Sequence, residues 1–349
     1  MTTDPAAPKN GPAVTEKTAR SLPKVSLHCH LTGSVRAATA VELARKHGVP
    51  LPRDAGSLYD IPSYESLGEF LRVYDVIGSA MRDADDFRRV TYESLTLGGA
   101  DHTVLYREIF VSPASHPGVP YATIMEGVRA GMREALTDRG IDSRVIVALH
   151  RERSAREAEA LVETVIEHRT EEVVGIGLDY EEVNGPPGLF ATAFRRAERA
   201  GLNRTAHSES GPPRHIEILL DDLHCTRVDH GYHVVTSPPV LRRCVDEGIA
   251  FTCTPVSSDI GRYSGGGDGS HELIDRMRRA GLRITIDSDD PPMFGTDPTN
   301  DFVVLAGALG YTARDLADFT FTAIDACWLD DSGKDGLRRR ARSLLEEIS

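Results

Sequence analysis

Eight short runs of apolar and β-branched residues alternate along this chain with longer segments of helical spacing. The runs are predicted strands, and they span Lys24–His30, His102–Pro113, Arg144–His150, Glu172–Glu182, Asn203–Glu209, Cys225–Gly231, Ala250–Ser257 and Arg283–Pro291. Strands that alternate with helices pair in parallel through right-handed crossovers. Eight such units in 349 residues predict an α/β fold, the (β/α)₈ or TIM barrel.

The segment from Ala37 to Gly99 is too long for one crossover helix. We expect it to form several helices inserted after the first strand, above the mouth of the barrel. Residues 1–20 mix Thr, Pro, Lys and Asn without an apolar core, which predicts a flexible N-terminal tail. Residues 21–349 are then expected to form a single barrel domain.

Charge and cysteine content narrow the class of partner. The net charge of −13 would repel nucleic acid and anionic membranes, so a small-molecule substrate is expected. No apolar run approaches the roughly 18 residues of a membrane span. The 5 cysteines are odd in number and form no CxxC, which favours a reducing compartment and therefore the cytoplasm. The sequence does not decide whether the chain forms a homo-oligomer.

Histidines and aspartates close four of the predicted strands, and they are His28, His30, His207, His230, Asp289 and Asp290. The carboxyl ends of barrel strands meet at one rim, where active sites lie in this fold. His28 and His30 alternate along one strand, so both side chains face the same side. Three imidazoles and one carboxylate are a suitable set of zinc ligands, with one position left for water.

These motifs resemble the adenosine/adenine deaminase family. The segments that carry the resemblance are PKVSLHCHLTGS (Pro23–Ser34), GIGLDYEEVNGPP (Gly175–Pro187), AHSESGPP (Ala206–Pro213), RVDHGYH (Arg227–His233) and TIDSDDPPMFGT (Thr285–Thr296). They run in order over nearly the whole chain. The second segment and SPASHPGVPY are closer to adenine deaminases, and to deaminases of aminodeoxyfutalosine, than to adenosine deaminases.

The resemblance implies a zinc-dependent hydrolase that replaces the C6 amino group of an adenine-type base with oxygen. The base would be adenine, adenosine or an adenosine derivative. One zinc ion per chain would be bound by His28, His30, His207 and Asp289. His230 would orient or deprotonate the attacking water, and Asp290 would hydrogen-bond the purine at N7.

Three positions depart from the family pattern. The family has His, two spacer residues and then Glu, whereas this chain reads His207-Ser208-Glu209. Glu209 is the expected proton donor to ring N1, because on a continuing strand it would face the same side as His207. Thr32 replaces a more usual acidic or amide residue, and Tyr180 lies where adenosine deaminases place a glycine near the base. Both are expected to contact substrate.

Two other functions stay open. A binuclear barrel hydrolase often uses a carboxylated lysine on the fourth strand, but no lysine lies between Lys46 and Lys334, which favours a single metal. A catalytically weak purine-binding protein on the same scaffold is the alternative suggested by the irregular HSES motif.

Overall fold

The computed structural model describes residues 13–54, 56–59, 66–260 and 270–348. Its strands are β1 (Lys24–His30), β2 (Val104–Val111), β3 (Asp142–His150), β4 (Val173–Asp179), β5 (Asn203–Arg204), β6 (His207–Ser208), β7 (Arg227–His230), β8 (Ala250–Cys253) and β9 (Arg283–Ile286). They pair in parallel in two series, β1-β2-β3-β4-β5 and β6-β7-β8-β9.

Backbone contacts at both seams close the two series into one ring. The predicted strand Asn203–Glu209 is interrupted at Thr205 and Ala206, so its first half pairs with β4 and its second half with β7. At the other seam, the N–H of His30 donates to the carbonyl of Asp289 at 2.9 Å. The Asp287 carboxylate supplements this seam, because it accepts from the N–H groups of Leu27 and His28 at 2.5 and 3.0 Å.

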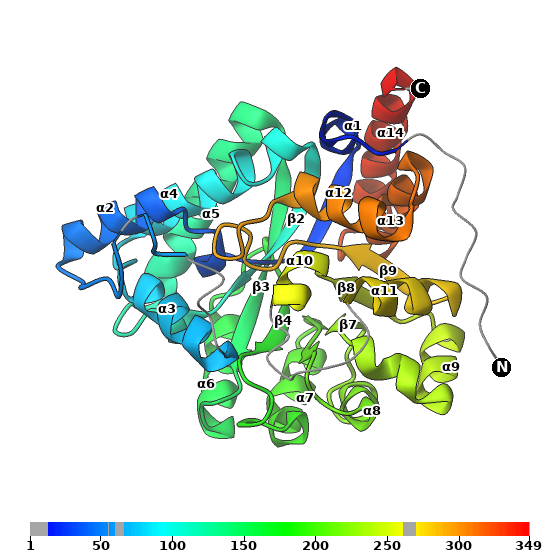
Figure 1. Cartoon of the computed structure of the whole chain (residues 1–349). Coiled ribbons are helices and arrows are strands. Elements are labelled where there is room, and N and C mark those ends of the chain that lie inside the picture. Colours follow the sequence, from blue (N-terminus) through cyan, green and yellow to red (C-terminus); the bar gives the residue numbers. More distant parts are fainter. Residues whose placement is uncertain (1–12, 55, 60–65, 261–269, 349) are drawn as a thin grey trace.

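Helices surround the strands in Figure 1. They are α1 (Glu16–Ser21), α2 (Ala37–His47), α3 (Leu67–Ser79), α4 (Ala84–Thr96), α5 (Tyr121–Arg139), α6 (Ala155–Glu167), α7 (Ala191–Arg199), α8 (Pro213–Asp221), α9 (Pro238–Asp246), α10 (Pro255–Ile260), α11 (Ser270–Arg279), α12 (Pro298–Leu309), α13 (Ala313–Ala326) and α14 (Asp331–Ile348). The predicted barrel is confirmed, and α2, α3 and α4 form the predicted insertion after the first strand.

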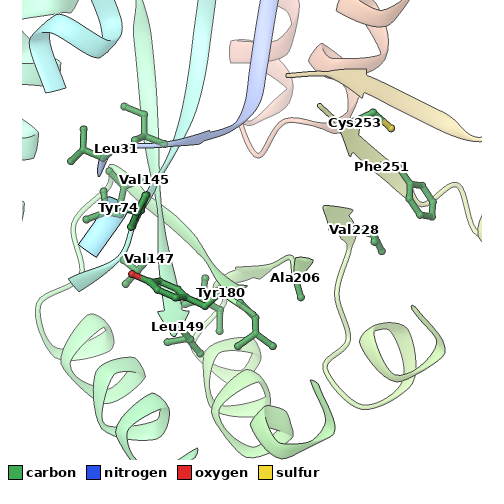
Figure 2. Packing of buried hydrophobic residues seen from close by; sticks show 14 of the residues in the cluster. Leu31, Tyr74, Val145, Val147, Leu149, Tyr180, Ala206, Val228, Phe251 and Cys253 are labelled. Carbon is green, nitrogen blue, oxygen red and sulfur yellow. The ribbon is translucent and has the colours of Figure 1, made fainter. Parts of the chain in front are cut away.

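Side chains of β3 show how the strand alternation builds two separate cores. Val145, Val147 and Leu149, labelled in Figure 2, belong to the large cluster between strands and helices. Ile146 and Ala148 face the opposite way and pack with Phe110 of β2 inside the barrel. A strand of this fold is therefore apolar on both faces, as expected for a parallel sheet covered by helices.

Gly177 of β4 makes room for this inner core. A Cβ atom at this position would lie 2.6 Å from Cε1 of Phe110. The Phe110 ring in turn lies 4.9 Å from the His28 ring and 5.0 Å from the His30 ring, measured between centroids. The close approach at Gly177 therefore lets one aromatic ring support two histidines at the carboxyl end of the barrel.

The N-terminal segment differs in part from expectation. Residues 1–12 lie outside the described residues, but Glu16–Ser21 form α1, whose N-cap is Thr15. Ala19 is buried in the main core, so the folded part begins before residue 21. None of the helices among the described residues is both long and apolar enough to cross a membrane.

Candidate metal centre and active site

Four predicted ligands converge at the carboxyl end of the barrel. Two come from β1, one comes from β6, and one comes from the segment after β9. One donor atom from each of His28, His30, His207 and Asp289 lies within 4.8 Å of the others. Asp289 Oδ1 is 3.0 Å from Nε2 of His28 and 3.4 Å from Nε2 of His30. All four residues are buried or nearly so.

The chemistry of this donor set fits a divalent metal ion. The Nε2 atoms of His30 and His207 face each other at 3.2 Å. Two neutral imidazoles can share only one proton in such a contact, whereas a cation between them would satisfy both lone pairs. Three imidazole nitrogens and one carboxylate oxygen are ligands that zinc accepts in catalytic sites.

Asp229 of β7 lies behind two of these histidines and was missed by sequence reasoning. Its fully buried carboxylate is 3.3 Å from Nδ1 of His28 and 3.5 Å from Nδ1 of His207. Thr252 of β8 donates to the same carboxylate at 2.9 Å. A carboxylate on the second ring nitrogen fixes the tautomer, so that Nε2 is left to bind a metal. The only sequence signal was its place directly before His230.

Electrostatics differ sharply between neighbouring site residues. Burial alone would lower the pKa of His28, but the carboxylates of Asp229 and Asp289 raise this pKa well above its ordinary value. Burial and the nearby His28 lower the pKa of His207 well below its ordinary value. Burial, together with the negative charge of Asp289, raises the pKa of Asp290 far above the usual range of a carboxyl group.

Left-handed backbone places three residues of this rim. Tyr180, His230 and Asp289 have φ angles of 72°, 62° and 62°. Such values cost a non-glycine residue roughly 1–3 kcal/mol and concentrate at functional sites. In β7, Arg227 and Asp229 face one side of the strand, and the sharp turn lets the next residue, His230, also reach the site.

His230 lies beside the predicted ligands rather than among them. Its ring centroid is 4.9 Å from that of His28 and 5.0 Å from that of His207. Its Nδ1 atom is 3.2 Å from the Thr254 hydroxyl and 3.8 Å from Oε1 of Glu209. This position suits a group that acts on water next to the metal.

Glu209 reaches the site by a route other than the expected one. Strand β6 ends at Ser208, so Glu209 lies in a bend and not on a continuing strand, and the alternation argument for its direction was wrong. Its side chain is 34% exposed, and its carboxylate nevertheless lies against His230. A solvent-accessible carboxyl group at this place is free to contact a ligand.

Asp290 lies beside the donor set, directly against the backbone of Gly33. A Cβ atom at Gly33 would lie 1.7 Å from Oδ1 of Asp290. That oxygen is buried and has no hydrogen-bond partner within the described part of the chain. A buried carboxyl oxygen without a partner is costly unless a ligand completes its contacts.

Thr32 and Tyr180 lie at the rim with partners of their own. The Thr32 hydroxyl is 3.4 Å from Nε2 of His116. The Tyr180 ring stacks on His150 with a centroid distance of 3.4 Å, and its hydroxyl donates to Asp75 of α3 at 2.6 Å. Figure 2 labels Tyr180 together with Tyr74, which lies on α3 next to Asp75. Tyr180 therefore joins the barrel to the inserted helices.

A ring of parallel strands with a buried three-histidine and aspartate set at its carboxyl end defines a metal-dependent barrel hydrolase. The profile of the family described as Adenosine deaminase matches residues 23–343. This chain belongs to that family.

Individual relatives cover almost the full length. An adenine deaminase of Vibrio parahaemolyticus is 31% identical over 95% of this chain and 98% of its own. The crystal structure of adenine deaminase from Arthrobacter aurescens superposes with a TM-score of 0.87 at 28% identity, covering 93% of this chain and 99% of that one. The crystal structure of an amidohydrolase from Burkholderia ambifaria with bound Zn superposes with a TM-score of 0.86 at 34% identity. It covers 98% of this chain and 97% of that one.

Proposed function

We propose that this protein hydrolyses free adenine, releasing ammonia and leaving a carbonyl group at C6. The chain is a hydrolase that deaminates an adenine-type base, and the choice of free adenine is supported by full-length relatives named adenine deaminase. The observation that carries the proposal is the convergence of His28, His30, His207 and Asp289 within 4.8 Å, with Glu209 and Asp290 beside them.

The metal is proposed to be a single zinc ion held by these four ligands. The donor set supports this, as does the bound zinc of the Burkholderia ambifaria relative. When bound, zinc lowers the pKa of water to about 7, which makes a nucleophile available at neutral pH. Asp229 would keep His28 and His207 in the tautomers that bind it.

Glu209 is proposed to supply the proton that the purine ring needs. Addition of water at C6 pushes an electron pair onto N1, and protonation of N1 prevents an unfavourable negative charge there. A positioned carboxylic acid contributes roughly 10²–10⁴ in rate at such a step. His230, 3.8 Å from this carboxylate, would orient or deprotonate the attacking water. The C6 nitrogen then leaves with a proton as ammonia.

Recognition of the base is assigned to the remaining rim residues. Asp290, with its unpartnered buried oxygen, would hydrogen-bond N7. Thr32 and Tyr180 would limit the space around the rest of the substrate. The five buried free thiols support a reducing, cytoplasmic location, and the acidic charge supports a small purine over a nucleic-acid polymer.

A panel assay with metal analysis tests the proposal. Ammonia release is measured from adenine, adenosine, adenine nucleotides, N6-substituted adenines and aminodeoxyfutalosine, with zinc determined per chain. We expect one zinc per chain and the highest kcat/KM for adenine. A higher kcat/KM for a nucleoside than for adenine would show that free adenine is not the preferred substrate. Tight purine binding without release of ammonia would indicate a binding protein. Activity on a pyrimidine alone would refute the assignment of the base.

The proton-donor role has its own test. Replacing Glu209 with Gln keeps the shape of the side chain and removes its acidic proton. We expect kcat to fall by roughly 10²–10⁴ while zinc content stays the same. Near-normal activity of this variant would exclude Glu209 as the donor.

A further inference from the structure

We propose that Glu182 is a positioning residue that anchors the turn carrying Glu209 and thereby aims the proton donor at the substrate. This proposal rests on the proposed function of Glu209. Glu182 itself is 4% exposed and lies after β4, outside the metal donor set. Its carboxylate contacts backbone N–H groups and the His215 side chain, whose Nδ1 is 3.6 Å from Oε2. Glu182 would therefore affect the reaction by positioning Glu209, without touching the substrate itself.

The Glu182 carboxylate accepts hydrogen bonds from three successive backbone N–H groups. Oε1 accepts from Glu209 and, at 3.1 Å, from Ser210, and Oε2 accepts from Gly211 at 2.9 Å. Successive N–H groups that point to one spot form an anion-binding concavity. Here the anion is a side chain of the same protein, so the turn is folded around a fixed buried charge.

A second buried charge fixes the start of the same turn. The Arg151 guanidinium, 1% exposed, donates to the carbonyl of His207 at 2.8 Å and to the carbonyl of Asp179 at 3.1 Å. It therefore bridges the end of β4 and β6, where the ladder of the fifth strand is interrupted. Burial would raise the pKa of Glu182, but the His215 side chain and, less strongly, the Arg151 charge hold this pKa below its ordinary value.

Gly211 lets the turn approach the carboxylate closely enough. A Cβ atom at Gly211 would lie 2.6 Å from Oε2 of Glu182 and 2.1 Å from Nδ1 of His215. Any larger residue would push the turn away from the anchor. The hydrogen bond from the Gly211 N–H to Glu182, 29 residues away in the sequence, therefore requires a residue without a side chain at position 211.

The anchor matters because little else determines where Glu209 points. Strand β6 ends at Ser208, and the spacing from His207 to Glu209 is one residue shorter than the family pattern. The Glu209 side chain is 34% exposed, and its carboxylate approaches His230 only to 3.8 Å. Its direction is therefore set by its backbone, which Glu182 holds.

The substitution Glu182→Gln removes the charge at nearly constant size and places an amide N–H₂ against N–H donors. We expect kcat on adenine to fall roughly 10- to 100-fold, a part of what a positioned acid contributes. KM and zinc content are expected to stay within about twofold, because neither the ligands nor Asp290 move. Glu181→Gln is the matched control and should keep full activity. Among the described residues, the Glu181 carboxylate accepts only an exposed hydrogen bond, from Asn184.

A double-mutant comparison separates positioning from a general loss of structure. If Glu182 acts through Glu209, adding Glu182→Gln to the Glu209→Gln variant causes no further loss of kcat. An equal loss in both backgrounds would overturn the proposal. If Glu182→Gln does not fold, Gly211→Ala serves as the second variant, because its added methyl group would clash with His215 and with the same carboxylate and so push the turn away from them.

Hydrogen exchange of the backbone amides of residues 209–211 provides a readout independent of catalysis. These amides should be protected in the wild type and exchange at least about tenfold faster in Glu182→Gln, with no change in Glu181→Gln. Unchanged exchange would overturn the proposal. If the wild type releases no ammonia from any purine, the proposed function fails, whereas the anchor is still decided by this measurement.

Discussion

Asp229 contacts two of the predicted metal ligands without being one of them. It has no exposed surface, and its two oxygens face the outer nitrogens of two histidines that belong to different strands. Thr252 donates one hydrogen bond to the Oδ1 atom of Asp229. The orientation of both imidazoles therefore depends on one carboxylate beneath them.

The first prediction concerns this carboxylate. Replacing Asp229 with Asn leaves the four ligands in place but weakens control of the His28 and His207 tautomers. We expect zinc affinity to fall roughly 10- to 100-fold, as is usual for such outer contacts. The measurement is zinc per chain after competition with a chelator of known affinity. The exposed Asp222, changed to Asn, is the control, and equal retention by both variants would contradict the prediction.

Helix α3 of the insertion contacts the rim through two aromatic side chains, Phe70 and Tyr74. Its Tyr74 lies edge-on to His30 with ring centroids 6.3 Å apart, and the same ring meets Tyr180 at 6.0 Å. One turn earlier, Phe70 stacks on Phe294 at 4.6 Å. Aromatic contacts therefore attach this helix to the ends of β1 and β4 and to the segment that follows β9.

The second prediction tests the polar part of this attachment. Tyr180→Phe removes the hydroxyl that donates to Asp75 and contacts Ser115 at 2.6 Å. The free energy of unfolding should drop by about 1–2 kcal/mol, because the buried Ser115 hydroxyl loses its partner. Urea denaturation measures this change. Tyr92→Phe, which loses one exposed bond to Asp138, should change stability by less than about 0.5 kcal/mol.

Across the whole molecule, a buried ion pair joins opposite sides of the barrel interior. The Arg227 guanidinium of β7 donates to Oε2 of Glu108 of β2 at 2.8 Å, and both side chains are 1% exposed or less. Trp328 covers the guanidinium at 4.0 Å, and its backbone N–H donates to the same glutamate. The pair thus connects two strands and the segment after α13.

The third prediction uses this pair to test closure of the barrel. Glu108→Gln leaves the Arg227 charge buried without its counterion and should destabilise the protein by about 3–5 kcal/mol. Adding Arg227→Met removes that charge and should recover most of the loss. Equilibrium unfolding of the single and double variants measures both values. A single variant as stable as the wild type would show that the pair does not stabilise the closed ring.

Expectations from the sequence were correct where neighbouring residues determine the structure, and they failed where residues distant in the sequence determine it. Alternation at His28 and His30 correctly placed both rings on one face, since strand geometry repeats every two residues. The same reasoning failed at Glu209, because the strand ends one residue earlier and Glu182, 27 residues away, holds the turn. Glu182 lay within the predicted fourth strand and gave no sign of this role.

The order of strands and helices, the insertion after the first strand and the presence of His and Asp at the strand ends follow from the chain itself, because periodicity and residue type act over a few neighbours. Only the folded ring decides which outer carboxylates meet those ligands. Asp229 contacts histidines of two other strands, Arg151 contacts carbonyls at the ends of β4 and β6, and Glu182 contacts the turn after β6. Such long-range contacts leave no periodic pattern, since they arise only when the strands close around a common interior.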